Sequence, residues 1–299
     1  MITVELDKVK KSFGNALVID DIDLKLEDGK TYALLGRNGS GKTTLMNLMC
    51  TKYLPDSGEI KLMDEVAYEN DRVLSDICFM KDFVPAFEDM KVSAIFKYAE
   101  KFYARWNKKL EEKLTRQFGL EAKKVYGFLS KGQQTAVGLI VGLCSNTRIL
   151  LLDEIYSGLD AVARKELYSI IMEEQERYTR TMVLSSHLIE EMTNLFSDVI
   201  ILHDGKIILN DSLDTVQTKA RKLTGRKDAE DILSSKNVLG RSAVGTMSEI
   251  YLYDDLSDSE LTELSGRGYK VASMNLQELF TAMTGGISTT SEIESNHED

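Results

Sequence analysis

The chain has 299 residues, enough for one large domain and a smaller one, and 43% of them are hydrophobic, as in ordinary globular proteins. The formal net charge of −11 at pH 7 disfavours broad nucleic-acid binding, so no nucleic-acid partner is expected. The cysteines, Cys50, Cys78 and Cys144, lack the spacing of a metal site or a disulfide framework. They predict buried thiols in a reducing compartment.

The first part of the chain has a strand pattern. Residues 1–30 alternate apolar and polar side chains, as around Val4 and Leu6, and residues 58–80 continue the strand character. This pattern predicts an antiparallel β lobe. Phe13 lies near a turn of this lobe. Without further evidence, an aromatic residue at such a turn is expected to be a loop residue that packs against the lobe.

Residues 36–44 fit a phosphate-binding loop with two glycines, a lysine and a hydroxyl at fixed spacing. The apolar run before the loop predicts a buried strand, and the apolar run after it predicts a helix. The alternative is a Gly/Ser loop that contains a lysine by chance, and such a loop would not require this flanking strand and helix. Lys42 can reach the outer phosphates of a nucleotide, and Thr43 can place its hydroxyl on Mg²⁺. The candidate ligand-binding residues are Gly36, Arg37, Asn38, Gly39, Ser40, Gly41, Lys42, Thr43 and Thr44.

The period then becomes helical, which predicts an inserted α-helical segment at about 84–146. Apolar residues recur at helical spacing from Val92, Asn107 is a candidate cap for a second helix that stops at Gly119, and a third helix is expected over 133–144.

Residues 149–152 are apolar throughout, as in a parallel strand covered on both faces, and Asp153 and Glu154 follow at once. Asp153 can bind Mg²⁺ through its water shell, and Glu154 can orient or deprotonate an attacking water. The alternative is that one of the two carboxylates caps the next helix.

The units that follow predict an α/β fold with a mostly parallel sheet. An amphipathic helix through Val162, a strand over 181–185, a helix from about His187 to Phe196 and a hairpin over 199–209 are expected in turn.

After Asn210 a small C-terminal α+β unit is expected over 211–286, followed by a disordered acidic tail at 287–299. Residues 211–231 are polar and basic, which favours a solvated helix face or loop. The elements expected next are strands near 249–253 and 269–273 and a helix over 276–283.

The segment Leu129-Ser130-Lys131-Gly132-Gln133 precedes the Asp153-Glu154 strand, and together with the phosphate loop it makes residues 1–210 resemble an ABC-transporter ATPase. The resemblance implies a P-loop NTPase core that binds ATP and Mg²⁺. It places residues 36–43 as the Walker A loop and 149–153 as the Walker B strand.

The same resemblance implies roles for further residues. Phe13 would stack on adenine, Glu154 would be the catalytic carboxylate, and His187 would be the switch histidine that contacts the γ-phosphate. Residues 157–160 resemble the D-loop. Ser130, Gly132 and Gln133 would contact the nucleotide held by a second ATPase subunit, so ATP would join two such subunits as a homo- or heterodimer.

The partner implied is a separate transmembrane permease, with this chain peripheral at the cytoplasmic face of the cell membrane. The longest apolar run, around 136–144, is about half of the ~18 residues that a membrane span needs. Residues 274–280 with Thr284-Gly285 resemble the closing helix of ATPases from bacterial exporters, including those for antimicrobial or amphipathic peptides. Export is therefore the expected direction.

Two positions depart from the family pattern. Lys131 replaces a glycine of the signature, and Asp82 stands where the family has the Q-loop glutamine, although the alignment also allows Lys81 there. Asp82 is a candidate metal or water ligand, with a plain loop carboxylate as the alternative. The alternative functions are an ABC ATPase not coupled to transport, and a regulatory module that binds ATP without useful turnover.

Overall fold

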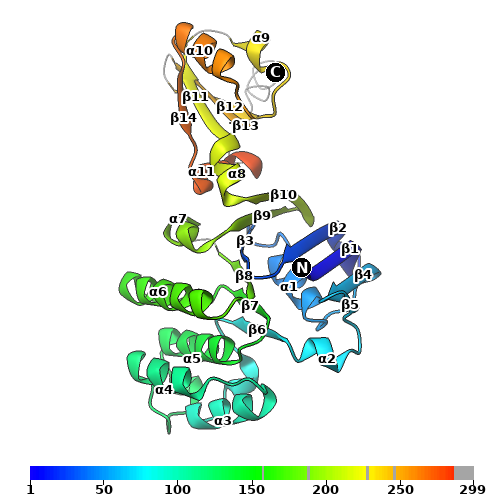
Figure 1. The fold of residues 1–299 in the computed structure, drawn as a ribbon, viewed down its shortest axis with the longest axis vertical. Coiled ribbons are helices and arrows are strands. Elements are labelled where there is room, and N and C mark those ends of the chain that lie inside the picture. The colour runs from blue at the N-terminus through cyan, green and yellow to red at the C-terminus, as the bar shows by residue number, and fades with distance from the viewer. Residues whose placement is uncertain (157, 187–188, 227–228, 245–246, 286–299) are drawn as a thin grey trace, which may run out of the picture. The chain divides into compact units, whose positions relative to one another are not determined.

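The computed structural model describes residues 1–156, 158–186, 189–226, 229–244 and 247–285 (Figure 1).

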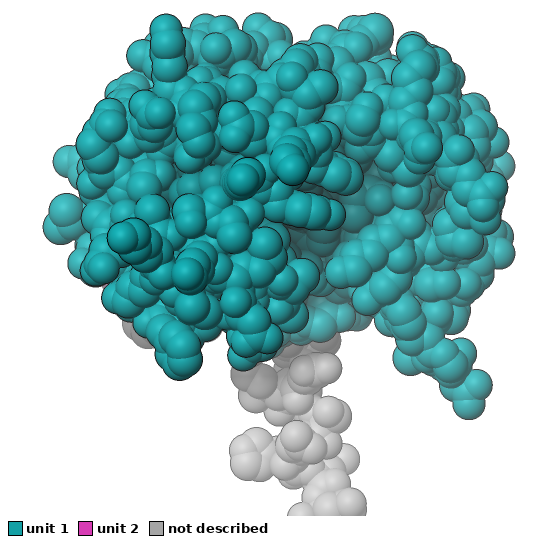
Figure 2. All heavy atoms as spheres, turned by 90° about the horizontal axis from the view of Figure 1, so that it is seen from below, with its two compact units in different colours: residues 1–187, 194–207 teal, residues 188–193, 208–299 magenta. Residues whose placement is uncertain are grey.

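The chain forms two compact units. The first holds residues 1–187 and 194–207, drawn in teal in Figure 2, and the second holds residues 188–193 and 208–299. The first unit contains the phosphate loop and is built on two sheets, described in turn below.

The antiparallel lobe is a four-stranded sheet with the order β2-β1-β4-β5. Its strands are β1 (Ile2–Phe13), β2 (Ala16–Glu27), β4 (Ser57–Leu62) and β5 (Glu65–Val66). The alternating apolar residues of β1 and β2 are buried in one core cluster with the helix α1 (Lys42–Met49). The predicted lobe is therefore confirmed, and α1 packs beneath it (Figure 1).

The second sheet has six strands in the order β10-β9-β3-β8-β7-β6. Every pairing from β9 to β6 is parallel. The strands are β3 (Thr31–Leu35), β6 (Ile77–Lys81), β7 (Ile149–Asp153), β8 (Thr181–Ser185), β9 (Asp198–His203) and β10 (Lys206–Ser212). The expected mostly parallel sheet is confirmed, and β6 belongs to it rather than to the lobe. Ligands of such sheets bind outside the carboxyl ends of the strands.

The inserted helices are α3 (Val92–Phe102), α4 (Lys108–Gln117) and α5 (Lys131–Cys144). As predicted, Asn107 caps α4 by accepting a hydrogen bond from the Leu110 N–H at 3.1 Å. Helix α5 begins two residues earlier than expected because Ser130 and Gln133 form a reciprocal capping box. It is almost wholly buried and packs on β6 and β7.

Short elements connect these parts: α2 (Asp71–Leu74) and the 3₁₀ turns Pro85–Phe87 and Tyr126–Phe128. The long helix α6 (Ala161–Arg177) was expected, but Val162 on its first turn is 78% exposed and does not join the core. The helix expected over 187–196 is shorter: α7 (Ile189–Met192) runs into a 3₁₀ turn, Thr193–Leu195.

The second unit contains a four-stranded antiparallel sheet with the order β12-β13-β11-β14. Its elements are α8 (Leu213–Lys219), β11 (Ala220–Gly225), α9 (Glu230–Leu233), β12 (Val238–Val244), β13 (Met247–Tyr253), α10 (Asp258–Gly266), β14 (Lys270–Ser273) and α11 (Leu276–Met283). From β11 to β14 the succession β-α-β-β-α-β is that of a ferredoxin-like module. The predicted α+β character, the last two strands and helix α11 are confirmed.

The prediction of a solvated helix face or loop over 211–231 is wrong for β11, which is a central strand of that sheet. Leu223 is buried in the core of the unit, whereas Lys222 on the opposite face pairs with Glu249 at 3.0 Å. The basic residues of β11 made the segment look solvent-exposed in the sequence. In the structure, residues on neighbouring strands pair with them, as Ser273 does with Arg221. The tail at 287–299 lies outside the described residues.

Candidate nucleotide-binding site

The phosphate loop connects β3 to α1, and at two of its positions only glycine fits without a steric clash. Gly41 has φ 106°, and a Cβ there would lie 3.0 Å from the Val18 carbonyl oxygen. A Cβ on Gly36 would lie 2.6 Å from the Leu202 carbonyl oxygen. The loop therefore needs glycine at both positions in order to pass close to the backbone of neighbouring strands.

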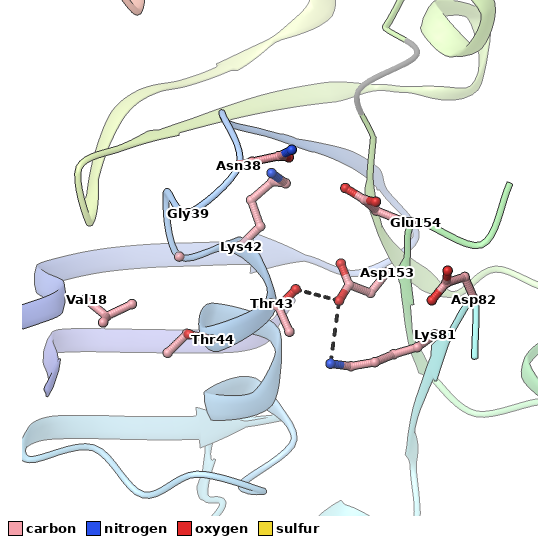
Figure 3. Close-up of a pocket in the computed structure, with 11 residues that line it drawn as sticks. Val18, Asn38, Gly39, Lys42, Thr43, Thr44, Lys81, Asp82, Asp153 and Glu154 are labelled. Carbon is pink, nitrogen blue, oxygen red and sulfur yellow. Dashed lines mark hydrogen bonds and ion pairs between the residues drawn. The ribbon is translucent and has the colours of Figure 1, made fainter. Parts of the chain in front are cut away.

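The loop borders a cavity of about 570 Å³ at the carboxyl edge of the parallel sheet (Figure 3). Of the candidate residues, both Walker carboxylates and most of the loop line it. The lining residues are Val18, Asn38, Gly39, Gly41, Lys42, Thr43, Thr44, Lys81, Asp82, Asp153 and Glu154. Gly36, Arg37 and Ser40 belong to the same loop but do not line the cavity.

Lys42 is a desolvated cation. Its ammonium donates to the carbonyl oxygens of Gly36 at 2.6 Å and Arg37 at 3.2 Å. Burial lowers the pKa of Lys42, against the opposing effect of the carboxylates Glu154 and Asp153. The Ser40 hydroxyl in the same loop is buried without a hydrogen-bond partner in the described part of the chain. A poorly solvated ammonium and an unsatisfied hydroxyl fit a loop that receives an anionic ligand.

Asp153 is held by three neighbours. Its Oδ2 accepts a hydrogen bond from the Thr43 hydroxyl at 2.7 Å, and its Oδ1 accepts one from the Ser185 hydroxyl at 2.6 Å. The Lys81 ammonium lies 3.8 Å from the same Oδ2 (Figure 3). Lys81, Asp153 and Ser185 end three adjacent parallel strands in register, which is why they meet.

Glu154 lines the cavity with an unusual backbone conformation. Its φ of 53° is in the left-handed region, which residues other than glycine rarely adopt. Its N–H donates to the Ser185 hydroxyl at 3.1 Å. Since such a conformation persists only where surrounding structure imposes it, the Ser185 contact is part of what orients the two carboxylates.

Sequence reasoning missed Ser185 as a site residue. The sequence analysis includes it only as the last residue of the strand expected over 181–185, and that strand pairs with the Walker B strand. Its position at a strand end beside a predicted catalytic strand was the available signal, but the parallel register was needed to use it.

The Thr43 hydroxyl and the Asp153 carboxylate are hard oxygen ligands in contact with each other, which suits Mg²⁺. Within the described ranges, no group of three or more His, Cys, Asp or Glu side chains could hold a metal ion. A magnesium ion at this place would therefore take its remaining ligands from water and nucleotide phosphate, as this ion commonly does.

The two positions that depart from the family pattern contact each other. The Lys131 ammonium lies 2.7 Å from Asp82 Oδ2, which joins the start of α5 to the loop after β6. Asp82 also lines the cavity, so its carboxylate faces both the site and the signature segment.

The structure does not bring every candidate residue to the cavity. Ser130 is exposed, and its hydroxyl accepts a hydrogen bond from the Gln133 N–H at 3.3 Å, while Gly132 lies in the first turn of the same helix. Phe13 is 44% exposed and makes an edge contact with Tyr53. These four residues do not line the cavity described above.

Two further predicted motif residues, the switch histidine His187 and Ser157 of the D-loop, lie outside the described residues. From the D-loop, Gly158 has φ 80° and Asp160 caps α6 by accepting the Ala163 N–H at 2.8 Å.

A glycine loop between a parallel strand and a helix, with a buried lysine and a Thr–Asp contact at the strand edge, defines a P-loop nucleoside-triphosphate-binding protein. The family described as "ABC transporter" matches residues 19–157. The chain is 30% identical to the probable sulfate/thiosulfate import ATP-binding protein CysA of Chlorella vulgaris, over 69% of this chain and 89% of that protein.

It is also 25% identical to the bacitracin transport ATP-binding protein BcrA of Enterococcus faecalis, over 95% of this chain and 96% of that protein. A solved structure of an ATP-binding subunit of an ABC transporter superposes with a TM-score of 0.65 and 20% identity, over 72% of this chain and 92% of that one. The chain belongs to the ATP-binding subunits of ABC transporters, a family of transport ATPases that bind ATP and work with transmembrane components. The predicted resemblance and fold class are confirmed.

None of the helices in the described segments combines the length and the apolar character needed to cross a membrane.

Proposed function

We propose that two ATPase subunits, each binding Mg²⁺-ATP, dimerise around the nucleotides and that hydrolysis drives a separate transmembrane permease. In this proposal, residues 1–210 are the ATPase domain, which binds and hydrolyses ATP, and residues 211–286 are an accessory unit. The observation that carries the proposal is the contact between Thr43 and Asp153 beside Glu154 and Lys42, because one cavity then holds side chains suited to binding phosphate, binding a metal ion and activating water.

The phosphates would lie against the loop, where backbone N–H groups and the start of α1 favour an anion. Lys42 would exchange its two carbonyl acceptors for phosphate oxygens and so recover the solvation that burial removes. Thr43 and Asp153 would hold the magnesium ion, which neutralises phosphate charge when it is bound. Asp82 is a second candidate for a metal or water contact.

Glu154 would orient the attacking water and accept its proton, since its carboxylate faces the cavity across from Lys42 (Figure 3). Ser185 would keep this residue and Asp153 in place through its two hydrogen bonds. Phe13 would stack on the adenine ring, and His187 would donate a hydrogen bond to the γ-phosphate.

The dimer accounts for the signature segment. Ser130, Gly132 and Gln133 begin the 14-residue helix α5, whose N-terminus favours an anion, yet they do not line their own cavity. Ser130 is exposed and can meet the nucleotide of a second subunit, as a homodimer or heterodimer.

We further propose export as the direction, with antimicrobial or amphipathic peptides as a candidate cargo, and a peripheral position at the cytoplasmic face of the membrane. The similarity to the bacitracin transport protein along nearly the whole chain supports export. The similarity to the sulfate/thiosulfate import protein covers a smaller share of the chain.

The test is Glu154→Gln in the full chain. Phosphate release is expected to fall at least a hundredfold while ATP binding persists, and gel filtration with ATP should show a dimer. The matched control is Glu112→Gln on α4, which is exposed and does not line the cavity. Brisk hydrolysis by Glu154→Gln would remove this residue from the proposed role, and a monomer at saturating ATP would reject the dimer.

A further inference from the structure

Lys81 contributes a second ammonium to the nucleotide cavity, and the phosphate-loop pattern does not include it. Its Nζ lies 3.8 Å from Asp153 Oδ2, the same oxygen that accepts the Thr43 hydroxyl at 2.7 Å. A cationic side chain therefore lies beside the two oxygen ligands that fit Mg²⁺. Lys42, by contrast, donates to loop carbonyls.

The position of Lys81 is set by the sheet. It ends β6 directly opposite Asp153 of β7, so the parallel register places its Cα beside the metal-binding edge. Its side chain packs with the ammonium 5.3 Å from the centroid of the Phe79 ring. The adjacent Asp82 carboxylate contacts Lys131 instead.

We propose that Lys81 is a phosphate-binding and charge-balancing residue that lets this site retain ATP when no divalent cation is present. The inference rests on the proposed function that the cavity binds ATP. An ammonium has three donors and no acceptor, so Lys81 cannot take over metal ligation as a glutamine could. It can instead donate to phosphate oxygens and counter the charge of Asp153 next to them.

In the absence of Mg²⁺, the Lys81 ammonium offsets the repulsion between the Asp153 carboxylate and the phosphates, so removal of this positive charge weakens ATP binding. In the presence of Mg²⁺, the ion supplies that charge, so removal of Lys81 has little effect on affinity. The Mg²⁺ dependence of ATP binding is therefore expected to increase when Lys81 is neutralised.

The experiment measures equilibrium binding of a fluorescent ATP analogue to the full chain, once in EDTA and once in excess Mg²⁺. Lys81→Gln and Lys81→Met are each expected to raise Kd about tenfold in EDTA and less than threefold in Mg²⁺. Lys81→Arg is expected to keep affinity within threefold in both buffers. The matched control is Lys61→Gln, because the Lys61 side chain has a similar exposure of 36% against 32% and is ion-paired to Glu59 at 2.9 Å.

Equal Kd values for the wild type and both neutral variants in EDTA would overturn the inference. A loss of the same factor in both buffers would also overturn it, because it would mean a general contact or a folding defect instead of charge balance. Failure of the wild-type chain to bind the analogue even in Mg²⁺ would reject the proposed function itself, which separates the two failures.

Discussion

Ser185 provides the sharpest test of how the site is built, because one hydroxyl serves two site residues. It donates to Asp153 Oδ1 at 2.6 Å and accepts from the Glu154 N–H at 3.1 Å, and the serine is fully buried. Replacement by alanine removes both bonds without adding bulk. The carboxylate then keeps only Thr43 and the more distant Lys81 among the contacts described for it.

The magnitude follows from the two bonds. A hydrogen bond to a charged group contributes about 1.5–3 kcal/mol and one between neutral groups about 0.5–1.5 kcal/mol. Since Thr43 still satisfies part of the carboxylate, we expect Ser185→Ala to lower the free energy of unfolding by about 2 kcal/mol. Loss of a residue that orients metal ligands costs about 10- to 100-fold in metal affinity or activity, so turnover should fall by that range.

The assay is equilibrium urea unfolding followed by tryptophan fluorescence, together with steady-state phosphate release. The chain has one tryptophan, Trp106, and it lies in the first unit, so the signal reports on the unit that holds the site. Ser169→Ala on α6 is the control, because that serine is exposed and its hydroxyl donates to the Lys165 carbonyl oxygen of the same helix. An unfolding free energy within 0.5 kcal/mol of wild type and turnover within about twofold would refute the positioning role.

Two further predictions concern charges at the site. A double-mutant cycle of Asp82→Asn and Lys131→Met should give a coupling of about 0.2–1 kcal/mol by urea unfolding, because the side chains are 31% and 48% exposed and solvent screens the pair; zero coupling would mean that the contact does not persist in solution. The lowered pKa of Lys42 means that the unfolded chain binds its proton more tightly than the folded one, so this residue destabilises the ligand-free protein at neutral pH. Relative to Lys42→Met, the free energy of unfolding of the wild type should increase as pH rises towards 10.5, the ordinary pKa of a lysine. A difference in unfolding free energy between the two proteins that stays constant across this range would contradict the lowered pKa.

The sequence by itself determined the elements whose signal is local. The phosphate loop has its glycines, lysine and threonine within a few residues, and the strand before it and the helix after it follow from short apolar runs. The Asn107 cap and the helix α11 were likewise readable, because each depends on residues within one or two turns. The same holds for Asp153 and Glu154 after a fully apolar strand.

The tertiary structure alone decided which distant residues meet. Lys81 and Ser185 join Asp153 because three strands from separate parts of the chain align in parallel register, and Asp82 meets Lys131 across 49 positions of sequence. Strand β11 could not be predicted from the sequence for the same reason: Lys222 forms its ion pair with Glu249, which lies on another strand. Pairing between strands depends on the context of the whole sheet. A charged side chain whose partner is distant in the sequence is therefore interpreted as solvent-exposed.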